Sequence, residues 1–168
     1  MAVTKITYAS SATITFGLNS LATSSTLTAG RESTQVDNTT NLYDDVLVQG
    51  VVVVGTTPTS GKTIAVYVWG SDTSLATTAL DDLIGTDGAC TITNEGVRNG
   101  FLKLGAAVTL TAATSDVVYP VGPFSVASLF GSMPKFWGLV VTHDTVAALK
   151  STGNTDMFKY TGITYTTA

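Results

Sequence analysis

Residues 43–54 and 63–69 read YDDVLVQGVVVV and TIAVYVW, and these two stretches decide the fold class. Both are rich in β-branched and aromatic residues, which favour extended strands over helices. The first stretch can bend at Gly50, because a glycine inside a strand often marks a kink. Large apolar side chains continue through the whole of the second stretch. We therefore interpret both as strands of an all-β domain.

Similar stretches lie on both sides of this pair, separated by clusters of Gly, Asn, Asp and Ser. Helical patterning is weak, because residues 72–83 read better as a loop and residues 125–133 allow one helical turn before Pro134. The further strands are predicted at 12–18, 89–93, 101–110, 136–142 and 157–165, with one or two more in 117–126, where Pro120 and Pro123 mark edges or bends.

This series of short strands predicts a two-sheet antiparallel β-sandwich, with a jelly roll as the first choice and at most one or two short helical turns. No linker, charge block or internal repeat divides the sequence. We therefore expect residues 1–168 to form a single β-sandwich domain, from which residues 1–11 can extend as an N-terminal arm.

The composition is unusually poor in charge. Charged residues make up 12% of the chain, against about 25% in ordinary soluble domains, and the formal net charge is −4. The eight basic residues are scattered singly, which argues against nucleic-acid binding. No apolar run is long enough to span a bilayer. The single cysteine and the absence of a signal-peptide pattern predict synthesis in a cytoplasm.

Three motifs suggest chemistry but do not support it. Residues 55–63 (GTTPTSGKT) resemble a phosphate-binding loop, yet a strand pattern follows them instead of a helix, so we interpret them as a loop between antiparallel strands. His143 is the only histidine, and we interpret it as a turn residue satisfied by backbone or water. The acidic pairs at 44–45 and 81–82 read as solvated loop residues. No catalytic residue, cofactor or metal ligand is predicted.

The segment at 27–41 (LTAGRESTQVDNTTN) is too polar to be expected in the core. It can form a surface loop or an extended arm that reaches a partner. Arg31 and Glu32 lie together in it, and a guanidinium can anchor a partner through paired hydrogen bonds. We weigh these two interpretations equally.

Three motifs also carry a resemblance to a known family. They are AGRESTQVDNT at 29–39, GPFSVASLFGSMPKFWG at 122–138 and HDTVAALKSTGN at 143–154. The stretches around them cover more than half of the chain, and they resemble a family of small virion structural proteins from tailed bacteriophages. None of the motifs has a catalytic rationale, so the resemblance indicates membership of a family and no enzymatic mechanism.

The resemblance implies a non-enzymatic capsid decoration or cement protein. Such a protein is made in the host cytoplasm, sits on the capsid exterior, bridges subunits of the major capsid protein and is a homo-oligomer, with a trimer favoured. Because terminal arms order easily on a partner, we expect contacts from the N-terminal stretch, including Lys5 and Thr7, and from Arg31 and Glu32.

A second function stays open from the residues alone. Aromatic rings that stack on sugars would make the chain a tail or head-fibre component that binds host glycans. The rings in question are those of Tyr67, Trp69, Tyr119, Phe124, Phe130, Phe136 and Trp137. Most of them lie in strongly apolar strands, where packing in the core is the default.

Overall fold

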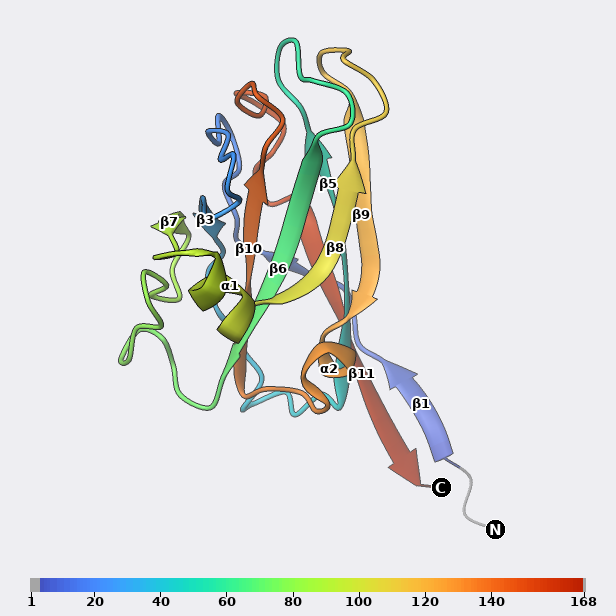
Figure 1. Cartoon of the computed structure of the whole chain (residues 1–168). Coiled ribbons are helices and arrows are strands. Elements are labelled where there is room, and N and C mark those ends of the chain that lie inside the picture. Colours follow the sequence, from blue (N-terminus) through green and yellow to red (C-terminus); the bar gives the residue numbers. More distant parts are fainter. Residues whose placement is uncertain (1–3, 168) are drawn as a thin grey trace.

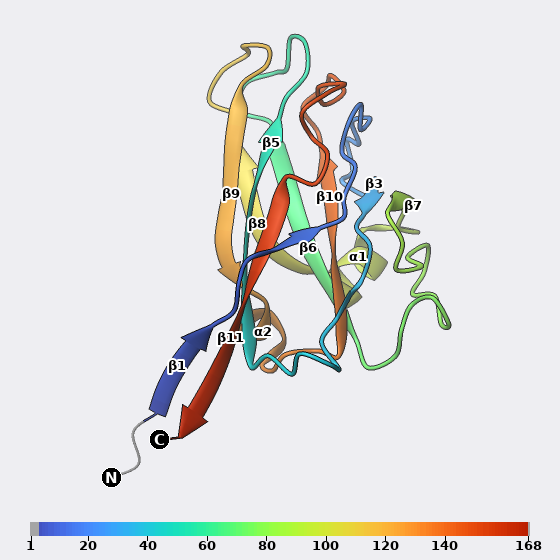
Figure 2. The same cartoon turned by 180° about the vertical axis from the view of Figure 1, so that it is seen from behind.

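Two antiparallel β-sheets face each other in the computed structural model, which describes residues 4–167 (Figures 1 and 2). The strands are β1 (Thr4–Tyr8), β2 (Ala12–Ile14), β3 (Ala29–Glu32), β4 (Val36–Asp37), β5 (Asp45–Val53), β6 (Thr63–Ser71), β7 (Gly88–Thr91), β8 (Lys103–Thr109), β9 (Val118–Ser125), β10 (Phe136–His143) and β11 (Phe158–Thr167). The two helices are α1 (Glu95–Phe101) and α2 (Val126–Phe130).

One sheet has five strands in the order β1-β11-β5-β9, with β2 also paired to β11. The other has six strands in the order β7-β3-β10-β6-β8, with β4 also paired to β10. The predicted all-β, two-sheet antiparallel sandwich is therefore confirmed. The finer prediction of a jelly roll stays a prediction.

Several predicted elements hold and others need correction. Residues 72–83 form turns, and α2 provides the helical turn predicted within 125–133. The predicted strand 12–18 shortens to β2, and the start of 101–110 belongs to α1, which begins after the N-cap Asn94. The loop at 55–62 leads from β5 in one sheet to β6 in the other, so it is not a hairpin loop.

The prediction that segment 27–41 is a surface loop or arm is wrong for most of the segment. Residues 29–32 and 36–37 form β3 and β4, both of which pair with β10 in the six-stranded sheet, and only residues 39–41 form an exposed turn. Glu32 and Ser33 are buried despite their polarity, because backbone groups satisfy their side chains. The Ser33 hydroxyl, for example, accepts a hydrogen bond from the backbone N–H of Leu139. Polarity alone was a poor guide to burial here.

The first hydrophobic core lies between the two sheets. Alternate residues of β5 point into it, and so do residues of β6, β9, β10 and β11. Phe16 and Phe158 meet edge to face at its centre, with ring centroids 5.7 Å apart. Trp137 packs in the same way against Tyr160, at 5.4 Å. These are the large side chains that hold the sheets together.

A second core lies on the outer face of the six-stranded sheet. Tyr67, Trp69 and Val140 point outward from β6 and β10, and the segment 75–102 covers them. Arg98 of α1 closes this cover, because its guanidinium lies 5.4 Å from the Tyr67 ring centroid and donates to the carbonyls of residues 26 and 27. The central strands β6 and β10 are therefore buried on both faces by the chain itself, whereas the edge strand β8 stays partly exposed.

Trp69 fits against Gly138, its cross-strand neighbour on β10. A Cβ atom at position 138 would lie 2.7–2.9 Å from three atoms of the buried indole ring. We expect Gly138→Ala to lower the free energy of unfolding by about 1–3 kcal/mol, because the indole has no room to shift. Gly100→Ala is the matched control: a Cβ at Gly100 of α1 meets nothing within 4 Å. Urea denaturation of both variants measures the difference, and equal stability would contradict this packing.

Candidate interaction surface

Lys5 and Thr7 lie on strand β1, which projects from the two packed sheets (Figure 1). β1 and the end of β11 form a two-stranded ribbon that projects away from the two packed sheets (Figures 1 and 2). The sequence predicted an N-terminal arm over residues 1–11; residues 1–3 lie outside the described range, and residues 4–8 form β1, which pairs with the C-terminal strand β11. The last contact of β11 with β5 is at Ile163, so residues 164–167 of β11 pair with β1 alone.

The two faces of this ribbon differ in polarity. Pairing sets Ile6 opposite Tyr165 and Tyr8 opposite Ile163, so these four side chains share one face. Ile6, Tyr8 and Tyr165 are 50%, 61% and 50% exposed. Lys5 and Thr7 belong to the other face, with their partners Thr166 and Thr164 of β11. A two-stranded ribbon is marginally stable in water, and an exposed apolar face makes it more dependent on a covering partner.

The apolar face of the ribbon continues onto the outer face of the five-stranded sheet. Because side chains alternate along a strand, Lys159 and Tyr165 lie on the same side of β11. The neighbouring strands add Leu47 and Val51 from β5 and Val118 and Pro120 from β9, all partly or largely exposed. We call this combined area, from Val118 across the sheet to the ribbon, the open face.

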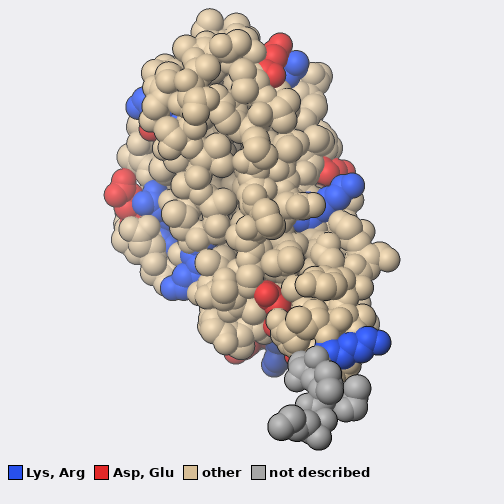
Figure 3. All heavy atoms as spheres, turned by 90° about the vertical axis from the view of Figure 1, so that its right-hand side faces the viewer, with Lys and Arg blue, Asp and Glu red and all other residues tan. Residues whose placement is uncertain are grey.

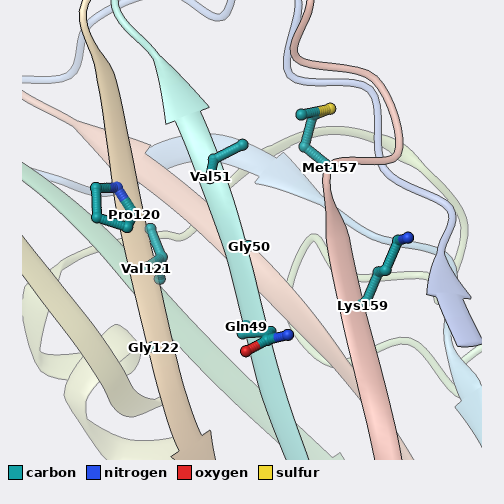
Figure 4. A pocket seen from close by; sticks show the side chains of 8 residues that line it. All are labelled: Gln49, Gly50, Val51, Pro120, Val121, Gly122, Met157 and Lys159. Carbon is teal, nitrogen blue, oxygen red and sulfur yellow. The ribbon is translucent and has the colours of Figure 1, made fainter. Parts of the chain in front are cut away.

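A shallow hollow of about 300 Å³ lies in the middle of the open face (Figure 4). Val51, Pro120 and Met157 line one end of it, and Gln49 and Lys159 line the other. The backbone of Gly50 and Gly122 also lines the hollow, between these side chains. Gly50 cannot be replaced freely, since a Cβ there would lie 2.7 Å from the Phe158 ring.

The open face carries few free charges. Asp44 accepts a hydrogen bond from the backbone N–H of Tyr165, and Asp45 accepts from the Ser125 hydroxyl and the Ala127 N–H. Lys159 is left as an exposed cation. Figure 3 shows an adjoining side of the molecule, on which charged atoms occur singly or in small groups between broad uncharged areas. Little charge has to be desolvated when such a surface is covered.

Arg31 and Glu32 do not lie on the open face. The Nε atom of Arg31 donates to the Asp87 carboxylate at 2.5 Å, which ties β3 to the loop before β7. Asp87 also accepts from the backbone N–H of Gly17. Arg31 keeps 30% of its side-chain area exposed, on the wall of a separate cleft. Whether it touches a partner stays a prediction.

Glu32 is 1% exposed, and its carboxylate accepts hydrogen bonds from the backbone N–H groups of Ile84 and Gly85 at 2.9 and 3.1 Å. Burial raises the pKa of this carboxyl, and the two N–H donors oppose that rise. The side chain holds the loop that covers the second core. Its role in the single chain is therefore structural.

The residues that suggested chemistry are also used structurally. His143 is fully buried, with Nδ1 2.8 Å from the Thr145 hydroxyl and Nε2 donating to the Leu21 carbonyl at 3.0 Å. The predicted backbone partner is present, together with one hydroxyl, but the prediction of a turn residue is wrong, because His143 ends strand β10 and pairs with Ile64 of β6. Asp81 and Asp82 are exposed in a turn, as predicted, and they also accept hydrogen bonds from the backbone N–H groups of Thr93 and Thr91. Burial raises the pKa of the Cys90 thiol to about 12.

Among residues 4–167, no group of three or more His, Cys, Asp or Glu side chains is placed to hold a metal ion. The helices in that range are too short to cross a membrane. No family model matches the chain, and no curated protein or solved structure matches it at a significant level.

Nothing in the sequence points directly to the open face. Its members are spread over four strands, and each looks like an ordinary strand residue until the sheet order is known. One pattern was informative: all residues from 64 to 69 are apolar, whereas the polar Gln49 interrupts the apolar residues of β5. A continuous apolar run indicates a strand covered on both faces, and an interrupted one indicates a strand with one open face.

We predict that Glu32→Ala lowers stability by about 1–3 kcal/mol, because two backbone N–H groups lose their acceptor in a buried place. Glu32→Gln keeps one side-chain oxygen and should lose less. Thermal unfolding followed by circular dichroism measures both. If Glu32→Ala unfolds at the temperature of the parent chain, its carboxylate does not hold the loop at 84–85.

We also predict that stability falls as pH is lowered from about 7.5 to 5.5. Burial lowers the pKa of His143 below its usual 6.5, so the unfolded chain takes up a proton that the folded chain resists. Protonation then favours unfolding, with a slope of at most about 1.4 kcal/mol per pH unit for one proton. His143 is the only histidine. His143→Gln should flatten the profile, and an equally steep profile in that variant would assign the effect to another group.

Proposed function

We propose that this protein is a non-enzymatic structural component of a tailed-phage virion. Its role is that of a capsid decoration or cement protein, which binds the outer surface of the head and stabilises contacts between major capsid subunits. In this proposal the chain is made in the host cytoplasm, acts as a homo-oligomer and reaches the capsid exterior by assembly.

The observation that carries the proposal is the difference between the two sheets. The chain uses the segment 75–102 to cover the outer face of the six-stranded sheet, yet no described segment covers the open face. Apolar side chains remain exposed there, including Val118 at 53% and the three ribbon residues. Contiguous exposed apolar surface on a folded domain marks an interaction site. A decoration protein needs such a surface to bury against a shell.

The low charge of the chain supports the same function. Binding to a shell removes water from a broad area, and each unpaired charge in that area would oppose it. The open face has Lys159 and the ribbon has Lys5, while nearby acidic groups are engaged by backbone or hydroxyl donors. The three sequence motifs that resemble phage virion proteins add independent support for a role in a particle.

The alternative of glycan binding by a tail or head fibre has less support. Trp69 and Trp137 are fully buried, and Tyr67 and Tyr119 are nearly so. These rings pack in the cores and cannot stack on a sugar. The large exposed rings are those of Tyr8 and Tyr165, on a projecting ribbon rather than in a hollow.

We predict that a variant carrying Val118→Asp and Met157→Asp binds particles at least about tenfold more weakly, because two buried carboxylates would oppose contact with the shell. The measurement is occupancy of particles that lack the protein, titrated with purified chain and quantified on gels. Leu104→Asp is the matched control, since Leu104 is 49% exposed but lies on β8 of the other sheet.

Circular dichroism first confirms that both variants keep the folded spectrum. Loss of binding in the double variant alone supports the proposed surface. Equal binding by the double variant and the parent chain would show that the open face is not the attachment surface. No binding by the parent chain would contradict a role in decorating the shell.

A further inference from the structure

The outer edge of β1 has backbone groups that no strand of the described chain pairs with. β1 is the last strand of its sheet and pairs with β11 on one side only. The backbone N–H of Ala9 donates to the carbonyl of Gly162, which fixes the alternation of hydrogen-bonded pairs along the ribbon. Lys5 and Thr7 therefore direct their backbone groups toward β11. Ile6 and Tyr8 direct theirs away from the sheet.

Three of the other edge strands, β7, β8 and β9, are closed by the chain itself. At β7 the Asp82 carboxylate accepts from the N–H of Thr91, and Asp81 accepts from the N–H of Thr93. At the opposite end, β8 and β9 bring the edges of the two sheets next to each other (Figure 1). Native proteins usually block edge strands in such ways to prevent pairing between molecules. Within residues 4–167, no side chain caps the outer edge of β1 and no other sheet edge lies against it. The strand also projects away from the two packed sheets (Figure 1).

We propose that β1 pairs with β1 of a second copy of this chain, antiparallel about a two-fold axis at Thr7. Ile6 of each copy then lies opposite Tyr8 of the other, and their outward N–H and C=O groups form the hydrogen bonds. Two ribbons join into one four-stranded sheet. Their apolar faces lie on the same side, because an axis perpendicular to the sheet preserves its faces.

A second copy fits this edge for reasons of symmetry and charge. An antiparallel edge is complementary to itself, and an aromatic residue opposite a β-branched one is a favourable cross-strand pair. Lys5 falls opposite Ala9, so its ammonium group meets no like charge. The register centred on Lys5 would set two lysines against each other, which disfavours that register. The ribbon projects from the body, which places β1 away from the two packed sheets (Figure 2).

The pairing is weak in free solution. Strands of five residues bury far less than the roughly 1,600 Å² of stable complexes, and we expect dissociation constants of about 0.1–1 mM. On a shell that holds many copies, tethering raises the local concentration into the millimolar range. That consequence rests on the proposed function, whereas the pairing itself does not. The β1–β1 pairing uses only the ribbon, so the rest of the domain stays free to form the contacts of a trimer.

The test is disulfide trapping of Thr7→Cys in the full-length chain. The axis places the two introduced thiols directly opposite each other in a pair without backbone hydrogen bonds, where Cα atoms are close enough for a disulfide. Cys90 is 2% exposed and does not compete. Mild oxidation should give a covalent dimer of twice 17.3 kDa on a non-reducing gel. Thr164→Cys, on the same face of β11, is the matched control and should cross-link at least about tenfold more slowly.

A second change tests the backbone bonds. Ile6→Pro in the Thr7→Cys background removes an outward N–H without touching the ladder to β11, and it should abolish trapping. Ile6→Thr keeps the N–H and should retain it. Equal trapping at positions 7 and 164, or undiminished trapping with Ile6→Pro, would overturn the proposal. Because no particles are present, failure here leaves the proposed function untouched, and that function fails only in the particle-binding experiment.

Discussion

The pairing of β6 with β10 is the interaction on which the rest of the structure depends. Eight residue pairs run in antiparallel register from Phe136 with Ser71 to His143 with Ile64. Side chains from both faces of these strands are buried, at about 1.5–3 kcal/mol for each large apolar residue. One face makes the core between the sheets. The apolar side chains on the other face are covered by the segment 75–102, which includes Arg98 and the loop that Glu32 holds.

The five-stranded sheet is built differently. It supplies the second wall of the inter-sheet core, and its opposite face stays open in the single chain. The glycine hollow, the engaged acidic groups and the apolar ribbon all lie on or beside this face. A domain that covers the central strands of one sheet on both faces and leaves the other sheet open on one face has a surface suited to a partner. This asymmetry is the physical basis of the proposed role in a capsid.

The sequence predicted the fold class well, because the burial of a strand is reflected in its own residues. The apolar runs at 63–69 and 136–142 became the central strands β6 and β10. Prediction failed at segment 27–41, where buried polar side chains are satisfied by backbone partners far away in the chain. It also missed α1, whose N-cap Asn94 was the local signal available. Glu32 was expected at a partner contact for the same reason, since polarity was read as exposure.

The candidate surface was only partly predictable. The expectation of an N-terminal arm with Lys5 and Thr7 identified the ribbon, but its pairing with β11 joins residues some 160 positions apart, and no local pattern encodes it. The open face likewise depends on which strands become neighbours. Sequence spacing indicates that a strand has one uncovered face, whereas only the sheet order shows that several such faces adjoin.

The most direct test of the central claim is the number of copies of this chain per purified virion, measured by quantitative mass spectrometry against the major capsid protein. A decoration protein that covers the shell through the open face should be present in a simple ratio to the capsid subunits. A copy number far below that, at the level of a tail or a set of fibres, would contradict the account. It would return the exposed tyrosines of the ribbon to consideration as a glycan-binding site.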